Sequence, residues 1–416
     1  MNEPAKSRVI WMLNHYAQMP GGAGGSTRHY SLCKYLRPHG WQGFILAAST
    51  ELNTGTQRLT DNEQSRLEVV DDVNYLWLKC PSYSGNGLAR MRNMLVFFWQ
   101  AMRKRQTGML PHPDVILGSS PHPFAALAGY MLAKRYRVPF IYEVRDLWPD
   151  SLIELGSISG NHPLSMLFRW IETKLARKSA RIVTIPPLVK HYFAPKRIPS
   201  EKIVWVANGI DLGFFPTPTP KDDTDKFQFM YFGAHGNGNA LHHVLDAMKL
   251  LQDRPDAQEI HLRLIGDGPL KAELVQQADF LELKNVTFEA PVPKKEIPAL
   301  AAQADGFVFN VMDAPVLTKY GISPNKLFDF FAAGRPILFA CSAVNNPVLE
   351  AEAGLSVQAG SAEKLAEGMM QLANMPLAER QAMGRRGRAY VEANHSFTAL
   401  AAKLADMLAR VVTEGK

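Results

Sequence analysis

Residues 320–336 read Tyr320-Gly-Ile-Ser-Pro-Asn-Lys-Leu-Phe-Asp-Phe-Phe-Ala-Ala-Gly-Arg-Pro336, a stretch that combines a loop with a helix start and is the most informative in the chain. Pro324 suits the first turn of a helix and Gly334 suits its C-cap. Lys326 and Asp329 are three residues apart, so a helix would place both on one face. Free backbone N–H groups at a helix start favour a phosphate or carboxylate. The stretch predicts a site for a nucleotide diphosphate and its ribose, unless it is an ordinary amphipathic helix with solvated Lys and Asp.

The same stretch resembles the signature region of the retaining GT-B glycosyltransferases of family 4. In that family two glutamates bracket a Gly/Pro-rich loop, and the second glutamate binds the nucleotide ribose. Asp329 stands at the second acid and is one methylene shorter, whereas Gly321 stands at the first, so that carboxylate is absent. A branch similar to bacterial WbuB-type enzymes, which build polysaccharide on lipid carriers, also lacks the first glutamate and has a Pro-x-Lys loop. Residues 323–326, Ser-Pro-Asn-Lys, match that variant.

Three further segments resemble the same family in the same chain order. They are Gly21-Gly-Ala-Gly-Gly25, similar to the first glycine-rich loop; Pro139-Phe-Ile-Tyr-Glu-Val-Arg-Asp-Leu-Trp-Pro149, similar to a motif at the interdomain cleft; and Trp205-Val-Ala-Asn-Gly-Ile-Asp211, similar to the motif after the last strand of the first domain. The four matches together span most of the chain. The resemblance implies an α/β protein of the GT-B fold, with two Rossmann-like doubly wound parallel-sheet domains facing a cleft.

Chain length and composition agree with two domains. The 416 residues are too many for one ordinary core, and 46% hydrophobic with 20% charged residues is typical of a folded soluble protein. Residues 215–225 are rich in Pro and charge, which is a linker composition. We expect an acceptor-binding domain over residues 1–208 and a nucleotide-sugar-binding domain over residues 209–395. The resemblance also implies that a helix in residues 396–416 packs back on the first domain.

Apolar runs alternate with helical stretches in both halves. This pattern is typical of parallel sheets that bind ligands at the carboxyl ends of their strands. In the first half we expect a helix over residues 26–36 and strands over residues 9–13, 44–48, 73–78, 114–117, 140–144 and 181–185. In the second half we expect a helix from about residue 239 and strands over residues 229–232, 261–265, 286–288, 306–310 and 337–340.

Glycines follow several of these strands. They lack a Cβ atom, so backbone N–H groups could approach an anion there, although a glycine cluster can also be a flexible turn. The first cluster lacks the GxGxxG spacing and the acid of an NAD site, which disfavours a dehydrogenase. The glycines expected to contact the donor are Gly24, Gly25, Gly233, Gly266 and Gly268.

The loop over residues 233–240 lacks the Arg and Lys that many family members direct at the donor diphosphate. We therefore expect Lys326, the backbone amides from Ser323 to Asn325, and His235 to neutralise the diphosphate. The alternative for His235 is a turn histidine that satisfies local backbone groups.

Arg145 and Asp146 directly follow an apolar strand, where a charged pair is costly unless it is paired or functional. The family has at this place a residue that contacts the transferred sugar or the acceptor. The resemblance therefore implies catalytic roles for Arg145, Asp146 and Lys326, with Asp146 as a candidate base for the acceptor hydroxyl. The alternative is a structural ion pair, either Arg145–Asp146 or Glu143–Arg145. Catalysis would depend on electrostatic stabilisation of the leaving nucleotide diphosphate, so we expect no metal or other cofactor.

Residues 88–105 have apolar side chains at helical spacing and basic residues at both ends. Such a helix can lie in a membrane interface, where five basic residues at about 1 kcal/mol each would give reversible binding. The alternative is a core-packed helix with solvated Arg ends. The residues expected to contact the membrane are Arg90, Arg92, Phe97, Phe98, Trp99, Arg103, Lys104 and Arg105.

The net charge of +7 also favours an anionic surface, and without a recognised motif it does not indicate nucleic acid. The cysteines are Cys33, Cys80 and Cys341, an odd number without paired spacing, which is typical of a reducing compartment. The sequence shows neither a signal peptide nor an apolar run of the ~18 residues that a membrane span requires. We expect a cytoplasmic protein peripherally associated with the inner face of the cell membrane.

The resemblance implies a retaining, metal-independent glycosyltransferase of the hexosyl or N-acetylhexosaminyl type. Its expected donor is a UDP-linked sugar, including N-acetylated or deoxy sugars, because the missing first glutamate leaves room for such a group. Its expected acceptor is a polyprenyl-diphosphate-linked saccharide in O-antigen (lipopolysaccharide), capsule or exopolysaccharide assembly. Two alternatives remain open: a UDP-sugar 2-epimerase of the same fold, and a catalytically inactive membrane-bound scaffold that binds saccharide or nucleotide.

Overall fold

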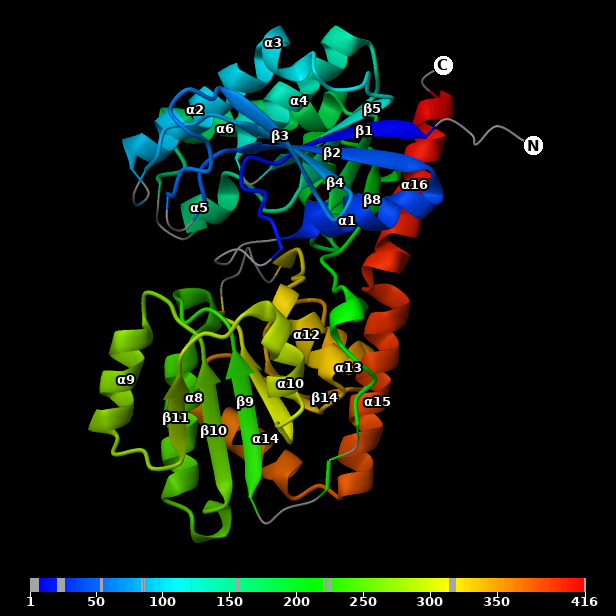
Figure 1. Cartoon of the computed structure of the whole chain (residues 1–416). Coiled ribbons are helices and arrows are strands. Elements are labelled where there is room, and N and C mark those ends of the chain that lie inside the picture. The colour runs from blue at the N-terminus through cyan, green and yellow to red at the C-terminus, as the bar shows by residue number, and fades with distance from the viewer. Residues whose placement is uncertain are drawn as a thin grey trace, which may run out of the picture. The chain divides into compact units, whose positions relative to one another are not determined.

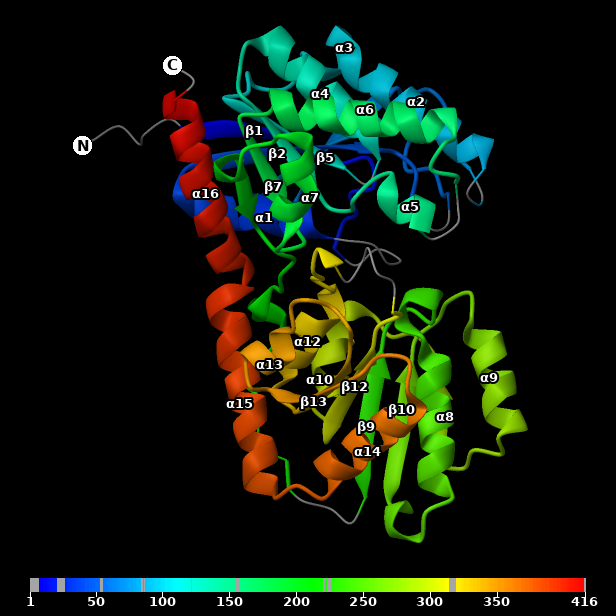
Figure 2. The same cartoon turned by 180° about the vertical axis from the view of Figure 1, so that it is seen from behind.

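The chain forms two compact units (Figures 1 and 2). Unit 1 comprises Met1–Asn208 with Phe397–Lys416, and unit 2 comprises Gly209–Ser396. The computed structural model describes residues 7–20, 27–52, 55–83, 85, 87–120, 122–154, 158–219, 221–222, 226–313 and 319–414.

Unit 1 contains one mainly parallel sheet. Its strands, in the order in which they lie side by side, are β3 (Ser65–Val70), β4 (Val73–Leu78), β2 (Trp41–Ala48), β1 (Arg8–Leu13), β5 (Val115–Ser120), β6 (Phe140–Val144), β7 (Arg181–Thr184) and β8 (Ile203–Trp205). Only β3 runs antiparallel to its neighbour. The central strands are buried along nearly their whole length, as expected for a parallel sheet covered on both faces.

Helices cover both faces of this sheet. They are α1 (Arg28–Leu36), α2 (Leu88–Met102), α3 (Lys104–Thr107), α4 (Pro123–Tyr136), α5 (Asp150–Glu154), α6 (Pro163–Lys178), α7 (Val189–Phe193) and α16 (Phe397–Glu414). Helices α2, α4 and α6 lie on one face, with α4 in the middle, and α1 and α16 pack together on the other (Figures 1 and 2). Helix α16 buries Leu400, Leu404 and Leu408 at helical spacing, so the last helix contributes to the core of unit 1.

Unit 2 contains an entirely parallel sheet. Its strands, in spatial order, are β11 (Val286–Glu289), β10 (Ile260–Ile265), β9 (Phe227–Phe232), β12 (Gly306–Asn310), β13 (Ile337–Ala340) and β14 (Gly354–Val357). The helices are α8 (Leu241–Gln252), α9 (Lys271–Phe280), α10 (Ile297–Ala301), α12 (Asn325–Ala333), α13 (Pro347–Glu350), α14 (Ala362–Ala373) and α15 (Leu377–Asn394). Helices α8 and α14 pack together on one face of the sheet, and α12 and α15 pack together on the other.

Short 3₁₀ helices connect several elements. They are η1 (Arg37–His39), η2 (Ala194–Lys196), η3 (Ser200–Lys202), η4 (Leu212–Phe214), η5 (Asn237–Asn239), η6 (Pro255–Ala257) and η7 (Lys294–Glu296). None of the helices in the described part of the chain combines the length and hydropathy of a membrane span.

The predicted fold class, two doubly wound parallel sheets, is confirmed. Three strands escaped the sequence analysis: β3, β8 and β14. All three are at or next to a sheet edge and have half-exposed side chains, so they lack the continuous apolar run of a buried strand. Helix α8 begins at Leu241 rather than near Asn239, because η5 occupies the preceding turn.

Candidate functional site

The carboxyl edge of the unit 2 sheet brings together most of the predicted donor-site residues. Strands β10, β9 and β12 are neighbours, so the loops after them meet at one edge. Gly233 follows β9, Gly266 follows β10 and Asn310 ends β12. Lys326 in the first turn of α12 reaches this edge, because its Nζ lies 3.2 Å from the point where a Cβ of Gly233 would be.

The two glycine loops touch each other so closely that side chains do not fit. A Cβ on Gly266, whose φ is +146°, would lie 2.0 Å from the carbonyl oxygen of Gly233. A Cβ on Gly268 would lie 2.5 Å from the carbonyl oxygen of His235. The His235 N–H also donates to the Asp267 carbonyl at 2.9 Å. The glycines are therefore required for the packing of one loop against the other.

Lys326 is held by two side chains that sequence reasoning missed. Its ammonium donates to the Tyr231 hydroxyl at 2.5 Å and to the Asn239 side-chain oxygen at 2.7 Å. Burial lowers the pKa of Lys326 from 10.5 to about 7, although the nearby Asp329 charge opposes this change. Lys326 is therefore close to half-protonated at neutral pH and would gain a full charge beside an anion. Neither Tyr231, within a strand, nor Asn239, in a turn, carries a sequence signal for this role.

Asp329 lies one turn further along α12 and is half-buried. Burial raises its pKa from 3.8 to about 6, although the charges of Lys294 and Lys326 act in the opposite direction. Among the described residues no side chain or backbone group forms a hydrogen bond with the Asp329 carboxylate. The carboxylate is therefore available to accept hydrogen bonds from hydroxyl groups of a ligand.

His235 is completely buried, and neither ring nitrogen has a hydrogen-bond partner. Burial, together with the charges of Lys271 and Lys326, lowers its pKa from 6.5 to about 4. In the free protein the ring is therefore neutral at physiological pH and can donate one N–H. The expectation that His235 helps to neutralise a diphosphate stays a prediction, and burial beside two lysines opposes a positive charge on the imidazole.

The loop before α12 is fixed by Asn345, a second residue that the sequence did not single out. The Ile322 N–H donates to the Asn345 side-chain oxygen at 2.8 Å, and the Asn345 amide donates to the Ile322 carbonyl at 2.9 Å. Ser323 and Asn325 lie at the start of α12, which has neither a side-chain cap nor an acid in its first turn. The backbone N–H groups at this end can therefore bind an anion.

In unit 1, Arg145 and Asp146 directly follow β6. The Arg145 N–H donates to the Ser120 hydroxyl at 3.3 Å, and the Asp146 side chain is exposed. Neither forms an ion pair with a described residue, and the proposed Glu143–Arg145 pair is wrong. Glu143 instead pairs with Arg28 and His29 of α1.

The buried Glu143 carboxylate accepts from Arg28 Nε at 2.9 Å and lies 2.7 Å from His29 Nε2. Arg28 also donates to the carbonyl oxygens of Val206 and Ala207. Burial alone would raise the pKa of Glu143, but the charges of His29 and Arg28 lower it well below its usual value. This network connects α1 to β6 and to the segment after β8.

A second cluster at the carboxyl edge of the unit 1 sheet contains two buried histidines, which sequence reasoning also missed. The rings of His15 and His122 contact each other edge to face at 4.6 Å. His15 Nε2 lies 2.6 Å from the Asn93 side-chain oxygen, whereas His15 Nδ1 and both nitrogens of His122 have no partner. Burial lowers the pKa of His15 to about 3 and keeps both rings neutral.

Gly24 and Gly25, predicted to contact the donor, lie outside the described residues. Among the described residues, no group of three His, Cys, Asp or Glu side chains could hold a metal ion.

The predicted membrane-contacting residues of α2 and α3 divide into two sets. Phe97 is completely buried against the His15 ring, so its assignment to a membrane surface is wrong. It belongs to the inward-facing stripe of α2, whose buried residues are Asn93, Met94, Phe97, Gln100 and Ala101. Trp99 is 64% exposed and Phe98 is half-buried. Arg90 is half-buried and donates to the Tyr16 hydroxyl, and the exposed basic residues are Arg92, Arg103, Lys104 and Arg105.

Several solved structures share this architecture. Sucrose-phosphate synthase from Thermosynechococcus elongatus is 15% identical, with a TM-score of 0.73 over 98% of this chain and 100% of that chain. HepE from Anabaena, solved in complex with UDP and glucose, is 15% identical, with a TM-score of 0.64 over 97% and 100%. WaaG, a glycosyltransferase involved in lipopolysaccharide biosynthesis, is 12% identical, with a TM-score of 0.66 over 96% and 99%. At these identities the likeness establishes the fold.

No curated protein matches the sequence. Two family models do match it, one in each unit. Residues 23–209 match the glycosyl transferase 4-like domain, and residues 226–375 match glycosyl transferases group 1. Because the two models together cover most of the chain and include the candidate site at Lys326, the chain belongs to the glycosyltransferases of the GT-B fold, with a glycosyl transferase 4-like first half and a group 1 second half.

Proposed function

We propose that this protein is a retaining, metal-independent glycosyltransferase that transfers a hexosyl or N-acetylhexosaminyl group from a UDP-linked sugar to a polyprenyl-diphosphate-linked saccharide. The observation that carries the proposal is the position of Lys326 in unit 2. It lies among the closely packed glycine loops, one helical turn from the unpaired Asp329 carboxylate. This arrangement offers a cation for a diphosphate and an acceptor for ribose hydroxyls.

The donor site is proposed from three kinds of group. Lys326 and the N–H groups at the start of α12 would bind the diphosphate, and Asp329 would bind the ribose. His235, with its unpaired ring nitrogens, would donate an N–H to a phosphate or sugar oxygen. The complexes of HepE with UDP support uridine as the base.

The rate acceleration would come mainly from Lys326 and the α12 amides, because they stabilise negative charge on the leaving UDP. Burial lowers the pKa of Lys326 in the free protein, and a bound diphosphate would raise it again, so the lysine would be charged before negative charge develops on the leaving UDP. Arg145 and Asp146 would contact the transferred sugar or the acceptor from unit 1. Asp146 is exposed and can exchange a proton with an acceptor hydroxyl.

The proposed acceptor and location come from the match to a lipid-carrier branch of the family and from the exposed basic residues of α2 and α3. WaaG, a structural neighbour, acts in lipopolysaccharide biosynthesis. We place the enzyme on the cytoplasmic face of the cell membrane, in O-antigen, capsule or exopolysaccharide assembly.

The first test is calorimetric titration of the protein with UDP, GDP and ADP. We expect selective UDP binding that weakens at least tenfold in Asp329→Ala and Lys326→Ala, since each loses a charged contact worth about 1.5–3 kcal/mol. Asp279→Ala is the matched control, because Asp279 is an exposed carboxylate on α9. Failure of all three nucleotides to bind would refute the donor site.

The second test follows turnover by NMR with a UDP-sugar and a polyprenyl-diphosphate-linked saccharide. Transfer with the anomeric configuration retained, with or without a chelator, is the expected result. Conversion of the free UDP-sugar to its 2-epimer without an acceptor would instead identify an epimerase.

A further inference from the structure

One face of unit 1 exposes an unusual number of apolar side chains. Sixteen large hydrophobic residues in the described part of the chain are exposed, and half of them are on α2, α4 and α6. Trp99 of α2 is 64% exposed and Trp170 of α6 is 57% exposed. The other six are Leu88, Leu95, Met131, Leu164, Met166 and Leu167. An apolar concentration of this kind indicates a surface that something covers.

The charge of the same three helices has one sign at the surface. They carry eight Lys or Arg residues and a single acid, Glu172. Glu172 is only 2% exposed and points inward, where it accepts from Lys196 at 2.5 Å and from the Tyr192 hydroxyl at 3.1 Å. Arg169 pairs with Asp150 of α5, outside the three helices. The exposed face is therefore apolar and cationic, with no exposed carboxylate of its own.

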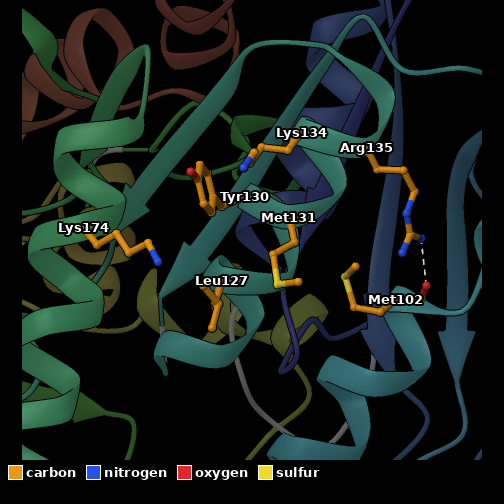
Figure 3. A pocket seen from close by; sticks show the side chains of 7 residues that line it. All are labelled: Met102, Leu127, Tyr130, Met131, Lys134, Arg135 and Lys174. Atoms are coloured by element: carbon orange, nitrogen blue, oxygen red, sulfur yellow. Dashed lines mark hydrogen bonds between the residues drawn. The ribbon is translucent and has the colours of Figure 1, made fainter.

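An open surface cavity of about 530 Å³, lined in part by exposed side chains, lies between the three helices (Figure 3). Its apolar lining consists of Met102 from α2 and Leu127, Tyr130 and Met131 from α4. Figure 3 shows these residues between Lys174 on one side and Arg135 on the other.

Three cations line the same cavity: Lys134, Arg135 and Lys174. Arg135 donates to the Met102 carbonyl at 2.7 Å, which fixes its position beside the end of α2. Lys134 and Lys174 form no ion pair with a described residue and lie over the rings of Tyr130 and Trp170, at 6.0 and 4.5 Å. The two ammonium groups therefore lack a counter-ion at an apolar cavity.

We infer that this cavity binds the phosphate of an anionic phospholipid, and that the surrounding α2/α4/α6 face docks unit 1 on a membrane. A lipid phosphate complements Lys134 and Lys174, and the first methylenes of its acyl chains match the apolar lining. Trp99 and Trp170 have the amphipathic rings that are enriched at the boundary between headgroups and hydrocarbon.

Membrane docking would bring the enzyme to its lipid-linked acceptor, so the biological role of this surface rests on the proposed function. Its evidence is separate, because no residue of the cavity belongs to the donor site. It also replaces the single-helix surface expected from residues 88–105 with one built from three helices, in which Phe97 has no part.

The test is co-sedimentation of the full chain with vesicles of phosphatidylcholine alone or mixed with phosphatidylglycerol. We expect at least about tenfold stronger binding to the anionic vesicles, decreasing with added salt. The double variant Lys134→Glu/Lys174→Glu should lose at least about tenfold of this binding. The matched control is Lys284→Glu/Lys364→Glu, which makes the same charge change on exposed lysines of unit 2 and should bind within about twofold of the unmodified protein.

A second measurement locates the surface. Brominated acyl chains should quench part of the tryptophan fluorescence, and Trp99→Phe/Trp170→Phe should abolish that part. The inference is overturned if binding is equal for both kinds of vesicle, if the lysine variant binds like its control, or if the tryptophan variant changes only self-association, which would mean that a second copy covers the face. The vesicles contain neither donor nor lipid-linked acceptor, so lipid binding and UDP binding can fail independently.

Discussion

Lys326 makes the affinity for UDP depend on pH. We consider a change of pH from 7.5 to 8.5. In this range the terminal phosphate of UDP, with its second pKa near 6, is already almost fully ionised and does not itself change charge. With a pKa of about 7, Lys326 is roughly a quarter protonated at the lower pH and roughly 3% protonated at the higher pH. If the diphosphate binds only beside the ammonium form, the dissociation constant rises about eightfold, or roughly 1.2 kcal/mol.

The affinity for UDP decreases with rising pH because the pKa of Lys326 is lower in the free protein than in the complex. Burial lowers the pKa of the free lysine, and a bound diphosphate restores it, so binding takes up a proton above pH 7. Calorimetry at pH 8.5 in two buffers with different ionisation enthalpies should therefore show uptake of nearly one proton per UDP.

The control for this prediction is Lys326→Met, which keeps most of the length of the side chain, without the terminal nitrogen, and removes its charge. Its UDP affinity should be weak and should no longer change between these two pH values. A constant affinity in the unmodified protein, with no proton uptake, would show that Lys326 does not bind the diphosphate as a cation.

Three other predictions concern single side chains. Gly266→Ala should lower the unfolding midpoint in urea and weaken UDP binding, because its Cβ would meet the carbonyl of the other glycine loop at 2.0 Å; Gly238→Ala, with nothing within 4 Å, should change neither quantity. Glu143→Gln should destabilise unit 1 by roughly 3–5 kcal/mol, because it leaves a buried arginine without its counter-charge, whereas Asp72→Asn, which breaks an exposed ion pair, should cost under about 1 kcal/mol by urea denaturation. Affinity for a UDP-linked sugar, which has no terminal phosphate to titrate near pH 6, should fall as the pH drops through about 6 and Asp329 is protonated. Asp329→Asn should remove this dependence in fluorescence or calorimetric titrations.

The sequence predicted the parts of the fold that have local signals. Buried parallel strands such as β1, β9 and β12 are continuous apolar runs, and the start of α12 has a proline at its boundary, so both could be read from neighbouring residues. The edge strand β3 alternates half-exposed and exposed residues, including charged ones, and gave no such run. Local pattern thus predicts strands that are buried on both faces, and of the half-exposed edge strands it found β11 but missed β3, β8 and β14.

The candidate site could be predicted only in part, for a different reason. The spacing of Lys326 and Asp329 is local, but the partners of Lys326 are 87 and 95 residues away in sequence. Arg28 and Glu143 are 115 residues apart in sequence. A local pattern could not indicate this pair and suggested the neighbouring Glu143–Arg145 pair instead. For Phe97, helical spacing could not tell which of two adjacent apolar stripes faces the sheet.

Because α16 belongs to unit 1, the two units can complete their cores in a different order from that in which they are synthesised. Unit 2 is one continuous segment, whereas unit 1 needs the nine buried side chains of α16, the last helix described, to complete its core. Ile210 and Ser396, at the two points where the chain passes between units, form a β-bridge, so both crossings are joined at one place. During synthesis, all of unit 2 is therefore available to fold before α16 has been made. Until then, unit 1 still exposes the surface of α1 that α16 covers in the folded protein. Translation of unit 1 thus begins first, but its hydrophobic core can be completed only after unit 2 has been synthesised.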